Sequence, residues 1–322
     1  MLAALALLAL GIALLTGGSR IPPSALWQAL FDPGQSVAAD VVGKLRLPRA
    51  LAAFAAGGLL ALAGALMQVL LRNPLADPYV LGLSGGAAVG ALGAMLAGLG
   101  TVFVNIGAAG GALLAIVIVF GLARGDFSRR QLSAAVDASP RLLLTGVILA
   151  SGWGAIIALM LTLAPEARLR GMLFWMMGDL NGIDGWAPAA AMLAVAVVLA
   201  FAAARDLNVM LRGEAVAHAL GVDVAALRRR IYFLAALATA LAVTTAGSIG
   251  FIGLVIPHAL RLLFGNDQRM LLPASALAGG TLLLLADTVA RTVVAPMQLP
   301  VGVIMSVIGV PSFVFLLMRR RA

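Results

Sequence analysis

Few residues in this 322-residue chain carry side chains that could do chemistry. The two histidines, His218 and His258, are far apart and have no cysteine or nearby acidic partner, so they predict no metal site. Cysteine is absent, which excludes disulfides and thiol chemistry. The Gly43-Lys44 pair precedes a leucine and lacks the first glycine of a P-loop, so the chain has no ATP-binding motif of its own. These absences indicate a protein that is not an enzyme and that holds no covalently bound cofactor.

One acidic residue lies inside a strongly apolar stretch. Asp287 occurs in LLLLADTVARTVV, and Arg291 follows four residues later on the same helix face. Ionisable residues within lipid cost free energy and usually serve a function. A proton-driven transporter usually has several buried acids, whereas this chain offers one, Asp287, which already lies beside the cation Arg291. A proton-coupled secondary transporter is therefore an alternative function that the sequence disfavours, and the role of Asp287 stays open.

The composition indicates what must surround these residues. The chain is 62% hydrophobic and only 11% charged, with a mean hydropathy of +1.08. Ordinary globular domains are about 45–50% apolar and about 25% charged. Most of the surface must therefore face lipid, and we predict an integral membrane protein. The net charge of +9 comes from arginines in short interruptions between apolar runs, which indicates membrane topology and not nucleic-acid binding.

The apolar runs predict an all-α protein, because lipid admits only helices or closed barrels and no barrel-type alternation is present. We expect one transmembrane domain over residues 1–322. The first run lacks a basic start and a clear cleavage site, so we interpret it as a span and not as a signal peptide. Ten spans are predicted, at about 1–18, 48–71, 79–99, 102–123, 142–163, 187–204, 231–247, 251–264, 271–294 and 301–318.

The distribution of basic residues orients these spans. Ten spans place both termini on the same side of the membrane. If the C-terminal RRRA is cytoplasmic, the cytoplasmic connections contain roughly twice as many basic residues as the external ones. This bias obeys the positive-inside rule and supports ten spans over nine. Both termini are thus predicted to be cytoplasmic.

The segment RNPLADP interrupts the apolar sequence between the second and third spans. Pro74 and Pro78 each remove a helical N–H and disfavour helix in the preceding residue, so we expect a tight inside turn. Gly82, Gly86 and Gly90 follow at four-residue spacing, which lets another helix approach closely. Packing alone accounts for this glycine stripe.

The inside connection over about 205–230 is longer than a tight turn requires. Its sequence, RDLNVMLRGEAVAHALGVDVAALRRR, predicts two short helices broken at Gly221. They could lie on the membrane surface as an amphipathic pair or dock into a groove of a partner protein. Since the chain lacks a nucleotide site, the partner we expect is a separate ATPase subunit.

Five motifs, in order along the chain, together resemble a known family. They are RLPRALAAFAAGGLLALAGALMQVLLRNPLADPYVLGLSGGAAVG, GEAVAHALGVD, GSIGFIGLVIPHALR, LLLLADTVAR and LPVGVIMSVIGVPSFVFLL. On these motifs the chain is similar to the permease subunits of ABC importers for iron-siderophores, haem and cobalamin, the type II importer permeases. The resemblance implies a homodimer in the bacterial inner membrane, with a substrate path on the two-fold axis, two cytoplasmic ATPase subunits and a periplasmic binding protein.

The resemblance also implies roles for particular residues. The coupling residues toward the ATPase would be Gly213, Glu214, Ala217, Leu220, Gly221 and Val222. A latch for acidic residues of the binding protein would be formed by Arg46, Arg49 and Arg291, since arginine pairs bidentately with carboxylates; the alternative is that these arginines contact lipid phosphates.

By the same resemblance, the substrate path is lined by the fifth and tenth spans and by a short outer helix in EARLRGMLFWMMGDLNG. Its apolar residues offer an adaptable surface for a planar ligand, or an interfacial anchor. They are Met172, Phe174, Trp175, Met176 and Met177. Because Arg168 and Arg170 could meet propionate carboxylates, we favour haem over a ferric siderophore or cobalamin, although a corrin ring would suit the same apolar run.

Overall fold

A computed structural model describes residues 1–17, 21–31, 36–123, 140–181, 183 and 185–319. The described regular structure is helical throughout. Some arginines of the charge count, namely Arg20, Arg124, Arg129, Arg130, Arg320 and Arg321, lie outside the described residues. The helices are α1 (Leu2–Leu15), α2 (Pro23–Phe31), α3 (Val37–Asp40), a π-helical turn η1 (Val41–Arg46), α4 (Leu47–Leu70), a 3₁₀ turn η2 (Pro78–Leu81), α5 (Leu83–Leu96), α6 (Thr101–Leu122), α7 (Pro140–Leu163), α8 (Glu166–Met176), α9 (Ala187–Met210), α10 (Glu214–Ala219), α11 (Val224–Ala246), α12 (Ile252–Phe264), α13 (Gln268–Ala290) and α14 (Val301–Arg319).

Each of the ten predicted spans overlaps a different α-helix, although 79–99 also takes in η2 and α11 begins earlier than predicted, and the described residues confirm the all-α prediction. Five of the described segments are long and apolar enough to cross a membrane, namely 37–70, 101–122, 142–163, 187–210 and 268–290. Four more apolar helices, α1, α5, α12 and α14, are shorter. The number of helices that cross the bilayer therefore stays a prediction.

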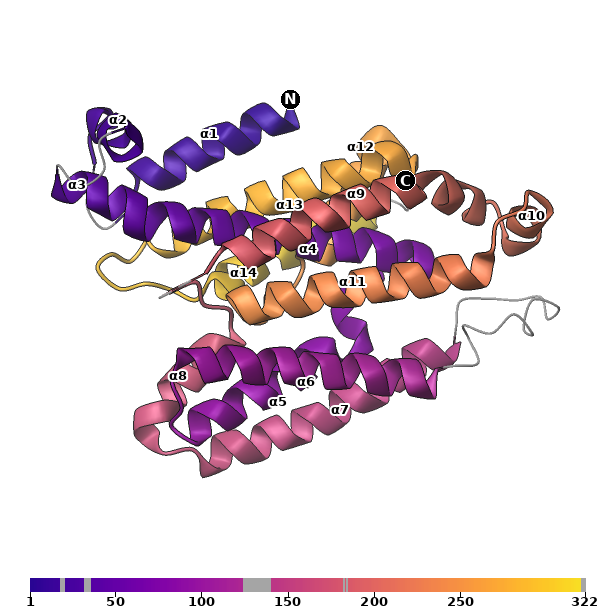
Figure 1. Cartoon of the computed structure of the whole chain (residues 1–322), viewed down its shortest axis with the longest axis horizontal. Coiled ribbons are helices and arrows are strands. Elements are labelled where there is room, and N and C mark those ends of the chain that lie inside the picture. Colours follow the sequence, from indigo (N-terminus) through magenta and orange to yellow (C-terminus); the bar gives the residue numbers. More distant parts are fainter. Residues whose placement is uncertain (18–20, 32–35, 124–139, 182, 184, 320–322) are drawn as a thin grey trace.

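The centre of the bundle is α4, which packs against α9, α11, α12 and α13 (Figure 1). Alanine, glycine and leucine make up most of this helix, and from Ala52 to Leu70 only Phe54 is not fully buried. Small residues let helix backbones come close in lipid. Gly57 lies against Gly279 of α13 and Gly64 against Gly253 of α12, so closely that an added Cβ would overlap the facing carbonyl oxygen.

A second group contains α5, α6 and α7, beside the larger group around α4 (Figure 1). The predicted glycine stripe forms its main contact, because Gly86 and Gly90 of α5 face Gly111 and Gly107 of α6. Gly82 has a left-handed backbone (φ 72°) at the start of α5, a conformation that favours glycine. The stripe is thus confirmed as a packing device.

The two ends of the bundle carry different short helices. In Figure 1, α10 lies at one end, and α2, α3 and α8 lie at the opposite end. The prediction for 205–230 needs one correction, because only α10 is a separate short helix. The chain does break at Gly221 (φ 80°), but the Asp223 side chain then accepts the Ala226 N–H and caps α11, so the following residues extend that long helix.

Candidate coupling and substrate-path sites

The short helix α10 is held to the bundle through its first residue. The carboxylate of Glu214 accepts a hydrogen bond from Arg228 Nη2 of α11 at 2.6 Å and lies 3.1 Å from Arg72 Nη2. Gly213 before the helix has φ 121°, which permits the sharp turn out of α9. The sequence indicated Glu214 but not its two arginine partners, because the pairing brings together the turn after α4, α10 and the start of α11.

The predicted coupling residues differ in where their side chains lie. Leu220 is 66% exposed, Val216 is 44% exposed, and Gly221 is exposed as well. Ala217 is fully buried on the face of α10 that packs against the bundle, so this structure does not display it to a partner, and its role in coupling stays a prediction. Val222 is partly buried and packs against the core. A partner would meet Val216, which the sequence analysis missed, together with Leu220 and Gly221.

The predicted outer helix is present as α8, and its residues face different ways. Arg168 and Trp175 line a cavity, whereas the Arg170 guanidinium lies over the ring of Phe174 at 5.4 Å. Met172 is fully buried, so this structure does not display it on an apolar surface, and its place in the substrate path stays a prediction. Met176 is partly buried, and Met177, just after the helix, is 37% exposed.

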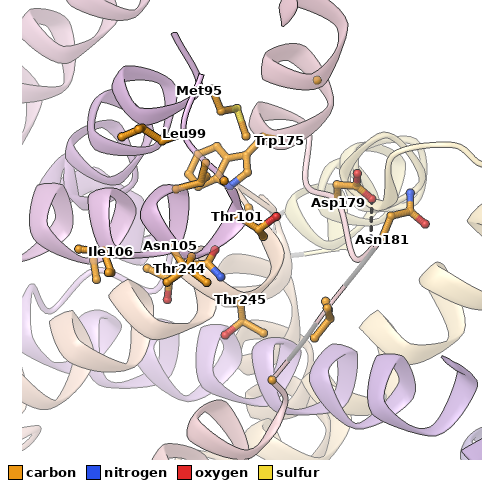
Figure 2. Close-up of a pocket in the computed structure, with 18 of the residues that line it drawn as sticks. Met95, Leu99, Thr101, Asn105, Ile106, Trp175, Asp179, Asn181, Thr244 and Thr245 are labelled. Carbon is orange, nitrogen blue, oxygen red and sulfur yellow. Dashed lines mark hydrogen bonds between the residues drawn. The ribbon is translucent and has the colours of Figure 1, made fainter. Parts of the chain in front are cut away.

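The cavity has a volume of about 920 Å³ and lies between α5, α6, α8, α9 and α11 (Figure 2). It shares α8 with the expected substrate path, but among the described residues none of its lining comes from α7 or α14, the fifth and tenth predicted spans. Its polar lining includes Thr101, Asn105, Asp179, Asn181, Thr244 and Thr245, and its apolar lining includes Met95, Leu99, Ile106 and Trp175.

Arg168 is engaged with the backbone of another helix. Its Nη1 donates to the carbonyl oxygen of Leu96 at 2.5 Å and lies 3.5 Å from that of Met95. The last carbonyls of a helix have no partner within the helix and attract cations. Arg168 therefore caps the C-terminal end of α5. The sequence did not predict this role, because the acceptor is 72 residues away in the chain.

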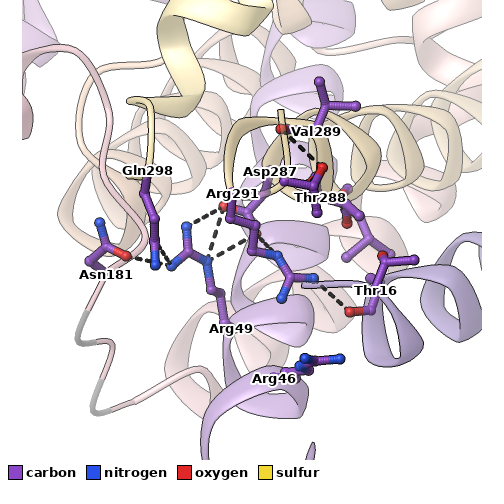
Figure 3. A network of polar contacts seen from close by, with 12 residues as sticks. Thr16, Arg46, Arg49, Asn181, Asp287, Thr288, Val289, Arg291 and Gln298 are labelled. Atoms are coloured by element: carbon purple, nitrogen blue, oxygen red, sulfur yellow. Dashed lines mark hydrogen bonds and ion pairs between the residues drawn. The ribbon is translucent and has the colours of Figure 1, made fainter. Parts of the chain in front are cut away.

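The end of the bundle that carries α2, α3 and α8 also holds a cluster of polar side chains (Figure 3). Asp287 is 1% exposed and accepts from Arg49 Nε and Nη2 at 2.8–3.1 Å. Arg291, four residues later and just past the end of α13, lies 3.5 Å from the same carboxylate. Arg49 also donates through Nη1 to the side-chain oxygens of Asn181 and Gln298. The predicted Asp287–Arg291 pair is thus present, but the shorter contacts are to Arg49.

The other arginines of the proposed latch point into the protein. Arg46 is 5% exposed and donates to the carbonyl oxygen of Leu14 at 2.8 Å. Arg291 is 9% exposed and donates to that of Ala13 at 2.6 Å. Both carbonyls belong to the last turn of α1. This structure does not display Arg46 or Arg291 to a partner, and their role as a latch stays a prediction.

A further titratable residue lies in the turn before α5. Asp77 accepts the backbone N–H of Tyr79 at 2.8 Å and so caps η2. Burial opposes ionisation of this carboxyl and raises its pKa to about 6, although the bond from Tyr79 acts in the other direction. The backbone N–H of Ile249 in turn donates to the Tyr79 hydroxyl at 3.0 Å, which fixes the turn against the segment after α11.

Comparison with known proteins supplies the family. The sequence matches the FecCD transport family over residues 5–319. The chain belongs to the FecCD transport family. It is 42% identical over 284 residues to the cobalamin import system permease protein BtuC of Halobacterium salinarum, covering 87% of this chain and 74% of that one. It is 39% identical over 325 residues to the vitamin B12 import system permease protein BtuC of Escherichia coli, covering 99% and 94%.

Two further relatives agree with this placement. The chain is 38% identical to an uncharacterized ABC transporter permease, YvrB, of Bacillus subtilis, covering 94% of this chain and 88% of that one. A solved structure described as an inward-facing metal-chelate type ABC transporter superposes with a TM-score of 0.84 at 30% identity, covering 99% of this chain and 97% of the other. This FecCD-family chain is thus an ABC importer permease, as the motifs predicted.

Proposed function

We propose that the chain is the membrane subunit of an ATP-driven importer for cobalamin or a closely related corrinoid. It would act in the plasma membrane as a homodimer, with two ATPase subunits on the side of α10 and a substrate-binding protein on the side of α8. The observation that carries the proposal is the 39% identity to a vitamin B12 permease over 94% of that protein's length. The termini would lie in the cytoplasm, with α10.

The exposed face of α10 supports a separate ATPase subunit. A helix anchored by an ion pair at its first residue and ending in an exposed leucine has the form of a docking element. The anchor contacts are partly buried, with side-chain exposures of 15–33%, so they fix the position of α10 more than they add stability. The exposed Val216 and Leu220 would then provide apolar contact area to the partner.

The substrate proposal departs from the haem preference of the sequence analysis. That preference rested on Arg168 and Arg170 as partners for propionates. Arg168 instead bonds to the end of α5, and Arg170 lies over an aromatic ring. What α8 offers a ligand is then mainly apolar and aromatic, which suits the face of a corrin as well as that of a porphyrin. Haem and ferric siderophores remain the alternatives to be tested.

The proposal is tested by reconstituting the permease with its ATPase subunit and binding protein in vesicles. We expect uptake of cyanocobalamin that requires ATP and is absent with ADP or without the permease. Haem and a ferric siderophore, measured in parallel, should be taken up far more slowly. ATP-dependent uptake of haem in preference to cobalamin would overturn the substrate, and uptake that follows a pH gradient without the ATPase would overturn the importer class.

A further inference from the structure

Arg49 joins three segments of the chain that are remote in sequence. It lies in the first turn of α4, and its Nε and Nη2 hold the carboxylate of Asp287 on α13 at 2.8–3.1 Å. Its Nη1 donates to Asn181 Oδ1 at 2.5 Å and to Gln298 Oε1 at 2.9 Å. Only arginine has a planar fork of five donors that can meet a carboxylate and two amides at once.

Two of these segments lead directly to the helices expected at the substrate path. Asn181 follows α8, and Gln298 precedes α14. The backbone connects the same two helices, because the Gly302 N–H of α14 donates to the carbonyl oxygen of Met177 at 3.0 Å. The end of α8 and the start of α14 therefore form one unit, and Arg49 attaches this unit to the central helices α4 and α13 (Figure 3).

The burial of the carboxylate makes this attachment strong. Asp287 is 1% exposed, and the Arg49 side chain is 13% exposed. Removing one member of a buried ion pair leaves the other charge without compensation, which is costly. Loss of Arg49 would leave Asp287 with the longer contact to Arg291 at 3.5 Å and would free both amide side chains. The arrangement of α8 and α14 thus depends on this one guanidinium.

We infer that Arg49 is a positioning residue for transport, which sets the spacing of the α8–α14 unit from the central helices at the mouth of the substrate path. The test of this role by substrate uptake rests on the proposed importer function, whereas the test by distances between helices does not. The inference is separate from a latch for the binding protein, because every acceptor named above belongs to this chain.

The test uses the absence of native cysteine, which lets spin labels be placed without background. Cysteines at Met270 and Met297, 62% and 61% exposed, carry the labels, one on the central helix α13 and one beside Gln298. Interlabel distances are measured in lipid nanodiscs on the chain alone, so that lost binding-protein contacts cannot cause a change. ATP-dependent uptake of cyanocobalamin by the full complex is measured for the same variants without labels.

We expect Arg49→Gln to broaden and lengthen the distance distribution and to abolish most uptake. Arg49→Lys keeps the charge but not the fork, so it should give an intermediate result. Lys44→Gln is the matched control, because Lys44 is a cation at the same end whose bond to Asp40 is on the surface, and it should change neither readout. If Arg49→Gln does not fold, Asn181→Ala combined with Gln298→Ala makes the same test on exposed side chains.

An unchanged distance distribution in Arg49→Gln, or an equal change in Lys44→Gln, overturns the inference. A changed distribution with undiminished uptake overturns the role in transport. If the unmutated complex shows no ATP-dependent uptake, the proposed function has failed, while the distances still show whether Arg49 positions the two helices.

Discussion

The coupling surface on α10 allows a quantitative prediction for Leu220. Burying a whole leucine side chain stabilises an interface by about 1.5–3 kcal/mol. Leu220 is 66% exposed in the free chain, so docking would bury about two thirds of it and contribute about 1–2 kcal/mol. Leu220→Ala removes most of that area and should weaken binding of the ATPase subunit about five- to thirtyfold, since 1.4 kcal/mol corresponds to a factor of ten.

The measurement is the dissociation constant of the purified ATPase subunit from the permease in nanodiscs, together with the stimulation of ATP hydrolysis by the complex. Leu122→Ala is the matched control, because Leu122 is equally exposed (65%) but lies at the end of α6. Both variants should unfold at the wild-type temperature, since exposed side chains add little to stability. Equal affinities of Leu220→Ala and Leu122→Ala would refute docking through α10.

Three further predictions concern stability, measured as the midpoint of thermal unfolding in detergent. Asp77→Asn keeps a cap for η2 and removes a carboxyl whose pKa is raised from 3.8 to about 6. Ionising this buried carboxyl costs stability as pH rises through that range, so the variant should be more stable than wild type at pH 7.5, by at most about 3 kcal/mol, and the difference should vanish below the unfolded pKa of 3.8. A midpoint difference that does not depend on pH would contradict this. Gly90→Ala should lower the midpoint because its Cβ would overlap the carbonyl oxygen of Gly107, whereas Gly110→Ala, with open space around it, should not, and equal midpoints would contradict the close packing of α5 and α6. Arg168→Gln should lower the midpoint by uncapping α5 while the preference for cyanocobalamin over haem is kept, and a changed preference would restore Arg168 to the substrate path.

The sequence was sufficient to predict the helices and part of their packing. Apolar runs of span length and the Pro74–Pro78 turn give the order of the helices, because these signals are local. The glycine stripe predicted a close helix contact because it too is a local signal: small residues at four-residue spacing indicate close packing against another helix. The break at Gly221 was also visible, since glycine permits the left-handed backbone found there.

The partners of the charged residues were not predictable in the same way. Asp287 was read with Arg291, which lies one turn away, whereas its shorter contacts are to Arg49, 238 residues distant. Arg168 looked available for a ligand because its acceptors are backbone carbonyls of α5 that no sequence pattern marks. The resemblance placed Ala217 at the partner surface, and the alternating alanines of α10 give no local signal of which face packs against the bundle, where Ala217 is fully buried. In each of these cases a tertiary contact decides which way a side chain points.

The polar cluster also shows how α1 belongs to the bundle. Arg46, Arg49 and Arg291 bring three positive charges to a region where the described residues supply one buried carboxylate, that of Asp287. Two of the guanidinium groups meet this imbalance by donating to the carbonyl oxygens of Ala13 and Leu14, at the negative end of the α1 dipole. Removal of α1 would leave those buried donors without these acceptors, which is costly. The side chains of Arg46 and Arg291 therefore tie the last turn of α1 to the central helices of the bundle.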